Sequence, residues 1–157
     1  MTLQSSGAIS LANIASEFGG STPHSLSEYY GVAGGVPSSG TISMSQFYGT
    51  SSPAYVYATG GSVSQSGNYR THYFYSSGSF YISNSGNSGG SNTVTYLIIA
   101  GGGGGTGIGG GGAGGYRYGS TGTVGTGTYT VTVGGGGAGR YSNYNTTTGG
   151  SGGNSSF

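Results

Sequence analysis

The sequence predicts a mainly β protein with three parts: a small N-terminal module of short capped helical turns, an antiparallel β-sheet or sandwich, and a glycine-rich β or polyproline II region. Three observations predict this order. A short serine-led motif recurs within residues 1–50, tyrosine-rich strand patterns occupy residues 51–100, and blocks of glycine fill residues 101–157. Because the composition changes near residues 50 and 100, we expect three domains with these boundaries.

The N-terminal motif is an internal repeat. Residues 5–14 (SSGAISLANI) reappear as residues 38–47 (SSGTISMSQF), and a shorter copy, HSLSEYYG, lies between them at residues 24–31. Each copy has a serine, an apolar residue and, three places after the serine, a residue with a polar side chain. This spacing is typical of a capping box at the start of a helix.

Each copy therefore predicts one or two helical turns that begin at a serine and end at a glycine. Only residues 11–18 are long enough for a true helix. The expected capping pairs are Ser25 with Glu28, Ser43 with Gln46 and, as a weaker version, Ser10 with Asn13, and the expected terminating glycines are Gly19, Gly31 and Gly49.

The apolar side chains of these turns have two interpretations. They either form a small core of their own or dock the module onto a partner protein. A segment of this size with few large hydrophobic residues is marginally stable alone, which favours docking. The residues expected to dock are Ile9, Leu11, Ile14, Phe18, Leu26, Tyr29, Ile42, Met44 and Phe47.

The middle segment predicts several short strands. We expect one strand at residues 53–58 and a β-hairpin at residues 69–83 that turns at 76–78. Residues 93–100 are apolar on both faces toward their end, so we expect a central, fully covered strand. A further strand is predicted at residues 128–133, between two glycine blocks.

Alternation assigns two faces to the first strand of the predicted hairpin. One face carries Tyr69, Thr71, Tyr73 and Tyr75, and the other carries Arg70, His72 and Phe74. For most tyrosines of this segment we expect packing against neighbouring strands. The tyrosines concerned are Tyr55, Tyr57, Tyr69, Tyr73, Tyr75 and Tyr81.

The glycine blocks lie at residues 101–105, 109–115 and 134–139, two of them directly after a strand pattern. An isolated glycine run should be a flexible linker, because glycine loses the most backbone entropy on ordering. Glycine chains can also pack closely as polyproline II helices, since no Cβ keeps them apart. The regular alternation of strand and glycine favours the ordered array.

The composition offers little for catalysis. The chain has two acidic residues, three basic residues, two histidines and no cysteine. An enzyme needs positioned acids, bases, nucleophiles or metal ligands, so we expect no enzyme, no metal site and no cofactor. Matches to the dinucleotide-binding glycine pattern arise from composition alone, because no helix-forming sequence follows them.

Low charge and short apolar runs argue against nucleic acid and membrane insertion, respectively. A net charge of +1 cannot supply the phosphate neutralisation that nucleic-acid binding requires. The longest apolar run, residues 96–100, is too short to cross a bilayer, so no membrane insertion is expected. A tyrosine-rich chain with so few charges would be poorly soluble as a monomer, which predicts a homo-oligomer.

Tyrosines within the glycine-rich segment have little predicted core nearby. Together with two arginines, they are the expected contact surface, because tyrosine combines an aromatic face with a hydroxyl. The set is Tyr116, Arg117, Tyr118, Arg140, Tyr141 and Tyr144.

Two parts of the chain resemble known phage proteins. Residues 69–82, 94–105, 110–117 and 129–139 are similar to the glycine-rich domain of tail fibres and receptor-binding proteins of bacteriophages, especially marine ones. Residues 3–11 and 36–49 resemble short modules that begin many structural proteins of the same phages. The family usually continues with further glycine blocks, which implies a protein longer than 157 residues.

The resemblance implies a non-enzymatic virion structural protein, made in the host cytoplasm and located in the virion. It would be a tail fibre or tail-associated attachment protein that docks onto other virion proteins by its N-terminus. Its glycine-rich region would project toward a host surface glycan or outer-membrane protein, in a homo-oligomer such as a trimer. The alternatives are a head fibre or decoration protein, a self-assembling glycine- and tyrosine-rich filament, and an ice- or glycan-binding adhesin.

Overall fold

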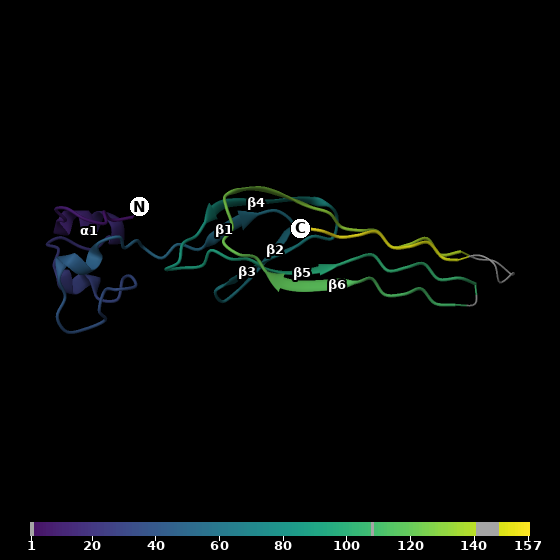
Figure 1. Cartoon of the computed structure of the whole chain (residues 1–157), viewed down its shortest axis with the longest axis horizontal. Helices are drawn as coiled ribbons and strands as arrows, with labels where there is room; N and C mark the ends of the chain where they lie inside the picture. Colours follow the sequence, from purple (N-terminus) through teal and green to yellow (C-terminus); the bar gives the residue numbers. More distant parts are fainter. Residues whose placement is uncertain (1, 108, 141–147) are drawn as a thin grey trace. The chain divides into compact units, whose positions relative to one another are not determined.

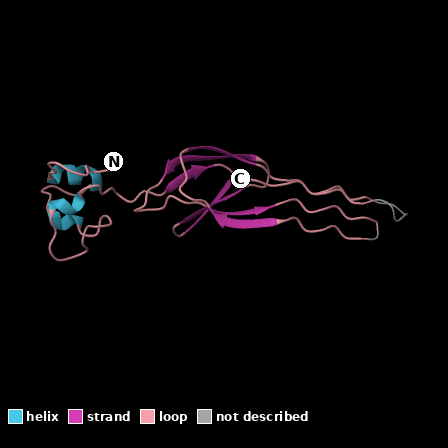
Figure 2. Cartoon of the chain, viewed as in Figure 1, coloured by secondary structure: helices cyan, strands magenta, loops and turns pink. Residues whose placement is uncertain are grey.

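The computed structural model describes residues 2–107, 109–140 and 148–157, and it is mainly β, as predicted (Figures 1 and 2). The chain forms two compact units. Unit 1 comprises the residues up to Tyr55 together with Gly86–Asn92, and unit 2 comprises Val56–Ser85 and Thr93–Phe157. The loop at 86–92 joins unit 1 because Asn87 bonds to residues 52 and 54: it donates to the Ser52 carbonyl and accepts from the Ala54 N–H.

Unit 1 contains the three predicted turns as helix α1 (Leu11–Phe18) and the 3-10 helices η1 (Leu26–Tyr29) and η2 (Met44–Phe47). The expected terminating glycines Gly19, Gly31 and Gly49 all have positive φ angles, of 76°, 67° and 68°. Glycine adopts this backbone conformation without the steric cost that a Cβ adds, so each turn ends where the sequence predicts.

The capping pairs differ from the prediction in strength. The Ser10–Asn13 pair, expected to be the weakest, forms a complete capping box: Asn13 N–H donates to Ser10 Oγ (3.2 Å) and Ser10 N–H donates to Asn13 Oδ1 (2.9 Å). At η2, Ser43 N–H donates to Gln46 Oε1 at 2.7 Å.

The expected box between Ser25 and Glu28 is wrong. The Ser25 hydroxyl bonds to the Ser27 hydroxyl at 2.7 Å, and the Glu28 carboxylate lies against His24. Competing side-chain partners therefore replace the cap.

Unit 2 contains three separate sheets. The central sheet has the order β1 (Val56–Thr59), β4 (Gly78–Ser85), β7 (Gly127–Val131), with antiparallel neighbours. Two antiparallel ribbons accompany it: β2 (Ser62–Ser66) with β3 (Tyr69–Tyr73), and β5 (Thr95–Ile99) with β6 (Tyr116–Ser120). The buried core side chains are Ala58, Phe80, Ile82, Val124 and Val131.

The predicted hairpin at residues 69–83 is wrong. β3 pairs with β2 across the turn at Gly67 and Asn68, whereas β4 pairs with β1 and β7. Gly67 has a φ of 55°, which a tight two-residue turn of this kind requires. Strand β2 has the sequence SVSQS, whose small polar residues give almost no strand signal, so the true partner of β3 was missed.

The glycine-rich region is an ordered bundle rather than a linker. Its four segments are defined here as segment 1 (100–106), segment 2 (109–115), segment 3 (132–140) and segment 4 (149–156). β5 continues into segment 1, segment 2 continues into β6, and β7 continues into segment 3, so the bundle extends from the strand ends of unit 2 (Figure 1). Segment 4, with the sequence GGSGG at 149–153, was not among the predicted blocks.

Backbone hydrogen bonds hold segment 1 at the centre of this bundle. Successive residues of segment 1 bond to segments 2, 4 and 3 in turn and then repeat. This period of three residues is that of a polyproline II helix. The bonds are Ala100 N to Gly115 O (2.8 Å), Gly103 N to Gly112 O (2.9 Å), Gly101 N to Gly153 O (3.0 Å), Gly104 N to Gly150 O (2.8 Å), Gly137 N to Gly102 O (2.8 Å) and Arg140 N to Gly105 O (2.9 Å).

The close approach of the segments requires glycine at every third position. A Cβ added at Gly104 would lie 2.1 Å from the Ala138 carbonyl oxygen, and one at Gly137 would lie 1.9 Å from that of Gly150. A Cβ at Gly112, by contrast, would meet nothing within 4 Å. The alanine that interrupts segment 2, Ala113, is exposed. Non-glycine residues therefore occur where the bundle has room for them.

Phe157 connects segment 4 to the aromatic side chains of the strands. Its ring lies 5.6 Å from that of Phe80 on β4, 6.3 Å from that of Tyr96 on β5 and 5.9 Å from that of Tyr129 on β7, measured between centroids. Aromatic pairs at these separations contribute about 0.5–1.5 kcal/mol each beyond buried area. The contacts secure the end of segment 4 against all three strands.

We predict that Gly104→Ala destabilises unit 2, because the new methyl group collides with backbone that cannot rotate away. Overpacking of this kind costs about 1–3 kcal/mol. Gly112→Ala is the matched control: it enters open space and should change stability by less than ~1 kcal/mol, with stabilisation the expected direction. Chemical unfolding followed by circular dichroism measures both. Equal effects of the two substitutions would contradict the bundle.

Candidate functional site

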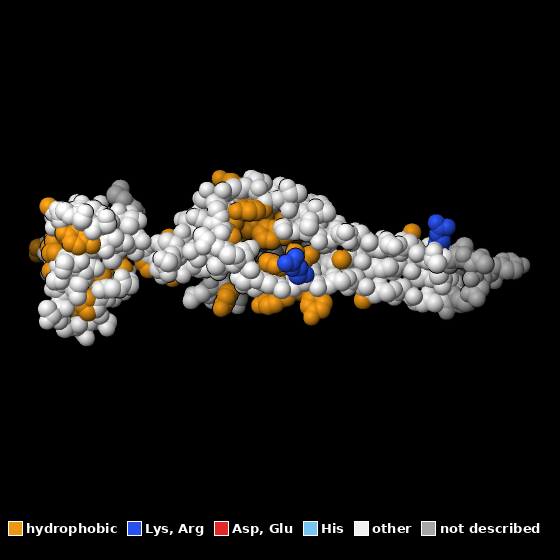
Figure 3. Space-filling view, in the orientation of Figure 1, with side chains coloured by type: hydrophobic (Ala, Val, Ile, Leu, Met, Phe, Trp, Pro, Cys, Tyr) orange, Lys and Arg blue, Asp and Glu red, His pale blue; other side chains and the backbone are white. Residues whose placement is uncertain are grey.

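The outer face of the β5–β6 ribbon is an exposed apolar surface of unit 2. Leu97 pairs with Tyr118, and Ile99 pairs with Tyr116, so all four side chains share one face. They are 60%, 70%, 62% and 78% exposed, respectively. Figure 3 shows hydrophobic side chains protruding beside these strands. We call these four residues the apolar face.

This result corrects the prediction of a central, covered strand at residues 93–100. Among the described strands, β5 pairs with β6 alone. Its inner face is covered, because Tyr96 contacts Phe157 and its ring lies over Gly119. The sequence TYLII carries apolar residues on both faces, and among the described residues only one of these faces is covered.

The four described members of the predicted contact set of the glycine-rich segment do not share one face. Tyr116 and Tyr118 lie on the apolar face, but Arg117 pairs with Ile98 and so belongs to the opposite face of the ribbon. Arg140 ends segment 3, where its N–H donates to Gly105 O. Tyr141 and Tyr144 lie outside the described residues. A contact role for this set stays a prediction.

The β2–β3 ribbon attaches to the central sheet by the face predicted to carry Arg70, His72 and Phe74. The Arg70 guanidinium lies 4.6 Å from the centre of the Tyr57 ring. His72 Nδ1 lies 2.7 Å from the Gly60 carbonyl oxygen, and its ring packs edge-on against Phe80 with centroids 5.1 Å apart. The two-face assignment of this strand is therefore confirmed.

Six tyrosines of residues 51–100, for which packing against neighbouring strands is expected, keep between 45% and 82% of their surface exposed. For those of β3 the cause is topological: the β2–β3 ribbon has two strands, and the opposite face of β3 makes the core contacts. Tyr57 contacts Arg70 of β3, and for the other five tyrosines cross-strand packing stays a prediction. The residues are Tyr55, Tyr57, Tyr69, Tyr73, Tyr75 and Tyr81.

All nine predicted docking residues contribute to the hydrophobic core of unit 1. Ile14 and Phe47 are 0% exposed and Tyr29 is 2% exposed. The remaining six are partly buried and pack against them: Ile9, Leu11, Phe18, Leu26, Ile42 and Met44. The side chains stabilise the unit itself, and docking through this unit stays a prediction.

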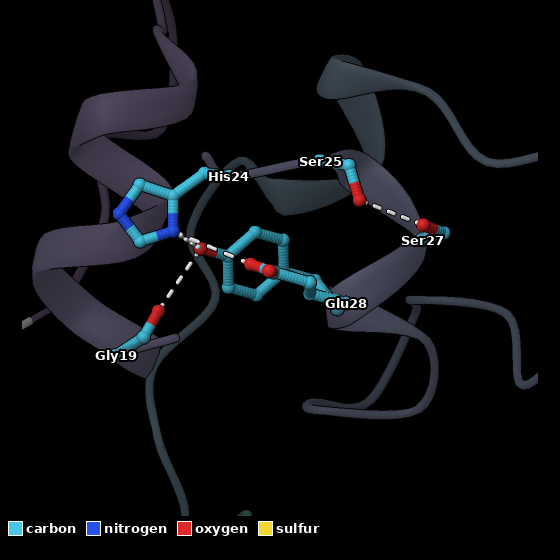
Figure 4. A network of polar contacts seen from close by, with 6 residues as sticks. Gly19, His24, Ser25, Ser27 and Glu28 are labelled. Atoms are coloured by element: carbon cyan, nitrogen blue, oxygen red, sulfur yellow. Dashed lines mark hydrogen bonds and ion pairs between the residues drawn. The ribbon is translucent and has the colours of Figure 1, made fainter. Parts of the chain in front are cut away.

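A polar network connects α1 to η1 beside this core (Figure 4). The Tyr29 hydroxyl donates to the Gly19 carbonyl at 2.9 Å and lies 3.1 Å from His24 Nδ1, which is 3.3 Å from Glu28 Oε2. Burial raises the pKa of the Tyr29 hydroxyl. Among the described residues, no three acidic, histidine or cysteine side chains form a group that could hold a metal.

The other carboxylate, Glu17, ties α1 to the segment that leaves unit 1. Ser52 N–H donates to Glu17 Oε1 at 2.8 Å, and the Ser52 hydroxyl donates to the Glu17 carbonyl at 2.7 Å. Burial acts to raise the pKa of the Glu17 carboxyl, but hydrogen bonds led by that from the Ser52 backbone outweigh it. The pKa therefore lies below its ordinary value of 4.5.

The chain belongs to the glycine-rich domain family, whose sequence model matches residues 76–157, just over half of the chain. The matched residues start just before β4 and include the whole glycine bundle. No curated protein and no solved structure matches the chain. The match supports the glycine-rich part of the resemblance, while the link to bacteriophages stays a prediction.

Within the described ranges, no helix is long and apolar enough to span a membrane.

The lowered pKa of Glu17 predicts that the stability of the protein depends on pH. Its folded pKa lies below the unfolded value, so the unfolded state binds the proton first as the pH falls. The stabilisation is complete above the ordinary pKa of 4.5 and is lost as the pH falls through the folded pKa. Glu17→Gln should reduce the fall in unfolding free energy between neutral and acidic pH. An unchanged pH profile in denaturant titrations would contradict this role.

Proposed function

We propose that this protein is a non-enzymatic structural component of a bacteriophage virion, a tail fibre or tail-associated attachment protein. The glycine bundle is the main observation that supports this proposal. Its segments leave the strand ends of unit 2 and lock together through backbone hydrogen bonds, with few side chains involved. Such a bundle is suited to presenting loops and ribbons rigidly, and its surface offers almost no catalytic chemistry.

In this proposal, unit 1 mounts the protein on other virion proteins. The unit has its own core, three capped or glycine-terminated turns and the Glu17–Ser52 connection to the following segment. A folded module that is separate in the chain from the glycine bundle is a suitable mount, because changes in one need not disturb the other.

Deletion of residues 1–50 tests the mount directly. The shortened protein should be absent from purified particles, because its docking module is gone, while circular dichroism still reports the β structure of unit 2. The full chain with Gly112→Ala serves as the control and should be incorporated normally. Wild-type levels of the shortened protein in particles would exclude unit 1 as the mount.

The proposal also includes self-association through the apolar face. Exposed apolar patches larger than a few hundred Å² are rare on monomers and mark interaction sites. The apolar face is built from neutral side chains, so a second copy meets it without charge repulsion. Two aromatic and two aliphatic side chains expose on the order of 500 Å², enough for the centre of an interface of about 800 Å² per partner.

Tyr118→Ser should weaken this self-association by at least about tenfold, as expected for an aromatic residue at the centre of an interface. Sedimentation analysis of the purified full chain measures the effect. Tyr69→Ser, which changes a tyrosine on the other ribbon that is 80% exposed against 70% for Tyr118, is the control and should leave assembly unchanged. A wild-type protein that stays monomeric at high concentration would contradict the homo-oligomer, and an open-ended polymer would favour the filament alternative.

A further inference from the structure

The outer face of the β2–β3 ribbon differs in chemistry from the apolar face. Direct pairing across the ribbon places a serine of β2 opposite each outward residue of β3. Tyr69 and Tyr73 are 80% and 45% exposed, and Tyr75, just after β3, is 82% exposed. The cross-strand pairs on this face are Ser62 with Tyr73, Ser64 with Thr71 and Ser66 with Tyr69. We call these residues, with Tyr75, the hydroxyl face.

Every side chain of the hydroxyl face carries a hydroxyl group, and none carries a charge. A hydroxyl both donates and accepts hydrogen bonds, while a tyrosine ring adds a flat apolar surface with two rotatable bonds. The one charged side chain of the ribbon, Arg70, lies on the opposite face against Tyr57. The face therefore offers neutral hydrogen bonding and aromatic stacking together.

The tyrosines are arranged as a platform rather than scattered. The rings of Tyr73 and Tyr75 stack with centroids 6.4 Å apart and planes at 6°. Tyr69 lies four residues before Tyr73 on the same strand face, a separation of about 13 Å. Beside the stacked pair is a hollow of about 230 Å³, whose polar lining includes Ser62, Ser76, Ser77 and Ser79.

The backbone beneath the stacked pair is held in place. Phe74, between the two tyrosines, points into unit 2 and packs edge-on against Phe80 at 6.3 Å. Gly61 has a φ of 62°, and a Cβ there would lie 2.5 Å from the Tyr73 carbonyl oxygen. This close approach fixes the strand end that carries the rings, and a site held in advance loses less entropy on binding.

We propose that the hydroxyl face binds a neutral glycan chain, with sugar rings lying on Tyr75, Tyr73 and Tyr69. The apolar side of a sugar ring fits an aromatic face, and sugar hydroxyls fit the row of serines. An acidic glycan would require a cation, which this face lacks. A hydrophobic protein segment would fit the apolar face better, because Leu97 and Ile99 are there.

A role for glycan binding in attachment rests on the proposed function. Binding itself can be measured on the purified chain, so the glycan proposal and the virion proposal can fail separately. If deletion of residues 1–50 prevents particle incorporation but the full chain binds no glycan, the proposed mount stands and only the glycan proposal fails. If the full chain binds a glycan but is absent from particles, the glycan proposal stands and the virion proposal fails.

The test is a glycan array followed by NMR titration of the purified full chain. The array carries neutral hexose and N-acetylhexosamine oligosaccharides beside sialylated and sulfated ones. We expect binding to one or more neutral oligosaccharides. In the titration, Tyr75→Ser should weaken affinity for the strongest of these by about five- to tenfold, through loss of one stacking ring. Tyr75 is exposed, so its loss should not unfold the protein.

Matched variants separate a binding role from a structural one. Tyr75→Phe retains the ring and should retain most of the affinity, whereas Ser64→Ala removes only a hydroxyl and should weaken binding by a smaller factor. Tyr118→Ser, on the apolar face, should leave the intrinsic affinity in the titration unchanged. Binding only to acidic glycans, binding only to a host protein, no binding, or binding insensitive to Tyr75→Ser would each overturn the proposal.

Discussion

The close backbone approach of glycine segments is the interaction on which unit 2 depends. Segment 1 has neighbours in three directions, and hydrogen bonds to them repeat every third residue. A methyl group at Gly101 or Gly104 would overlap a neighbouring carbonyl oxygen. Glycine has a high entropic cost of ordering, and the strands β5, β6 and β7 offset part of this cost by holding the segment ends in register.

Because the bundle consists mainly of backbone, specific side-chain chemistry concentrates on the strands. Two ribbons carry it, and they differ. The outer face of β5–β6 presents Leu97, Ile99, Tyr116 and Tyr118, an apolar set suited to burial against another copy. The outer face of β2–β3 combines tyrosines with serines and has hydrogen-bonding groups throughout. Assembly and ligand binding can therefore occupy separate surfaces of one unit.

Local patterns predicted local structure well. Serine spacing and glycine positions located α1, η1 and η2, and alternation correctly divided the two faces of β3. Pairing was harder, since β2 has the sequence SVSQS and no apolar pattern reveals it as the partner of β3. The exposure of β5 could not be predicted either, because an apolar strand is covered only where the topology supplies a neighbour. The hydroxyl face could not be predicted because it depends on the pairing of β2 with β3.

Amide hydrogen exchange, resolved by NMR, tests the ordered bundle most directly. We expect the amide hydrogens of Gly103, Gly104 and Gly137 to exchange slowly, at rates comparable with those of the β4 amides, because each donates to a neighbouring segment. Exchange of these three amides at the rates of an unstructured glycine linker, while β4 stays protected, would contradict it.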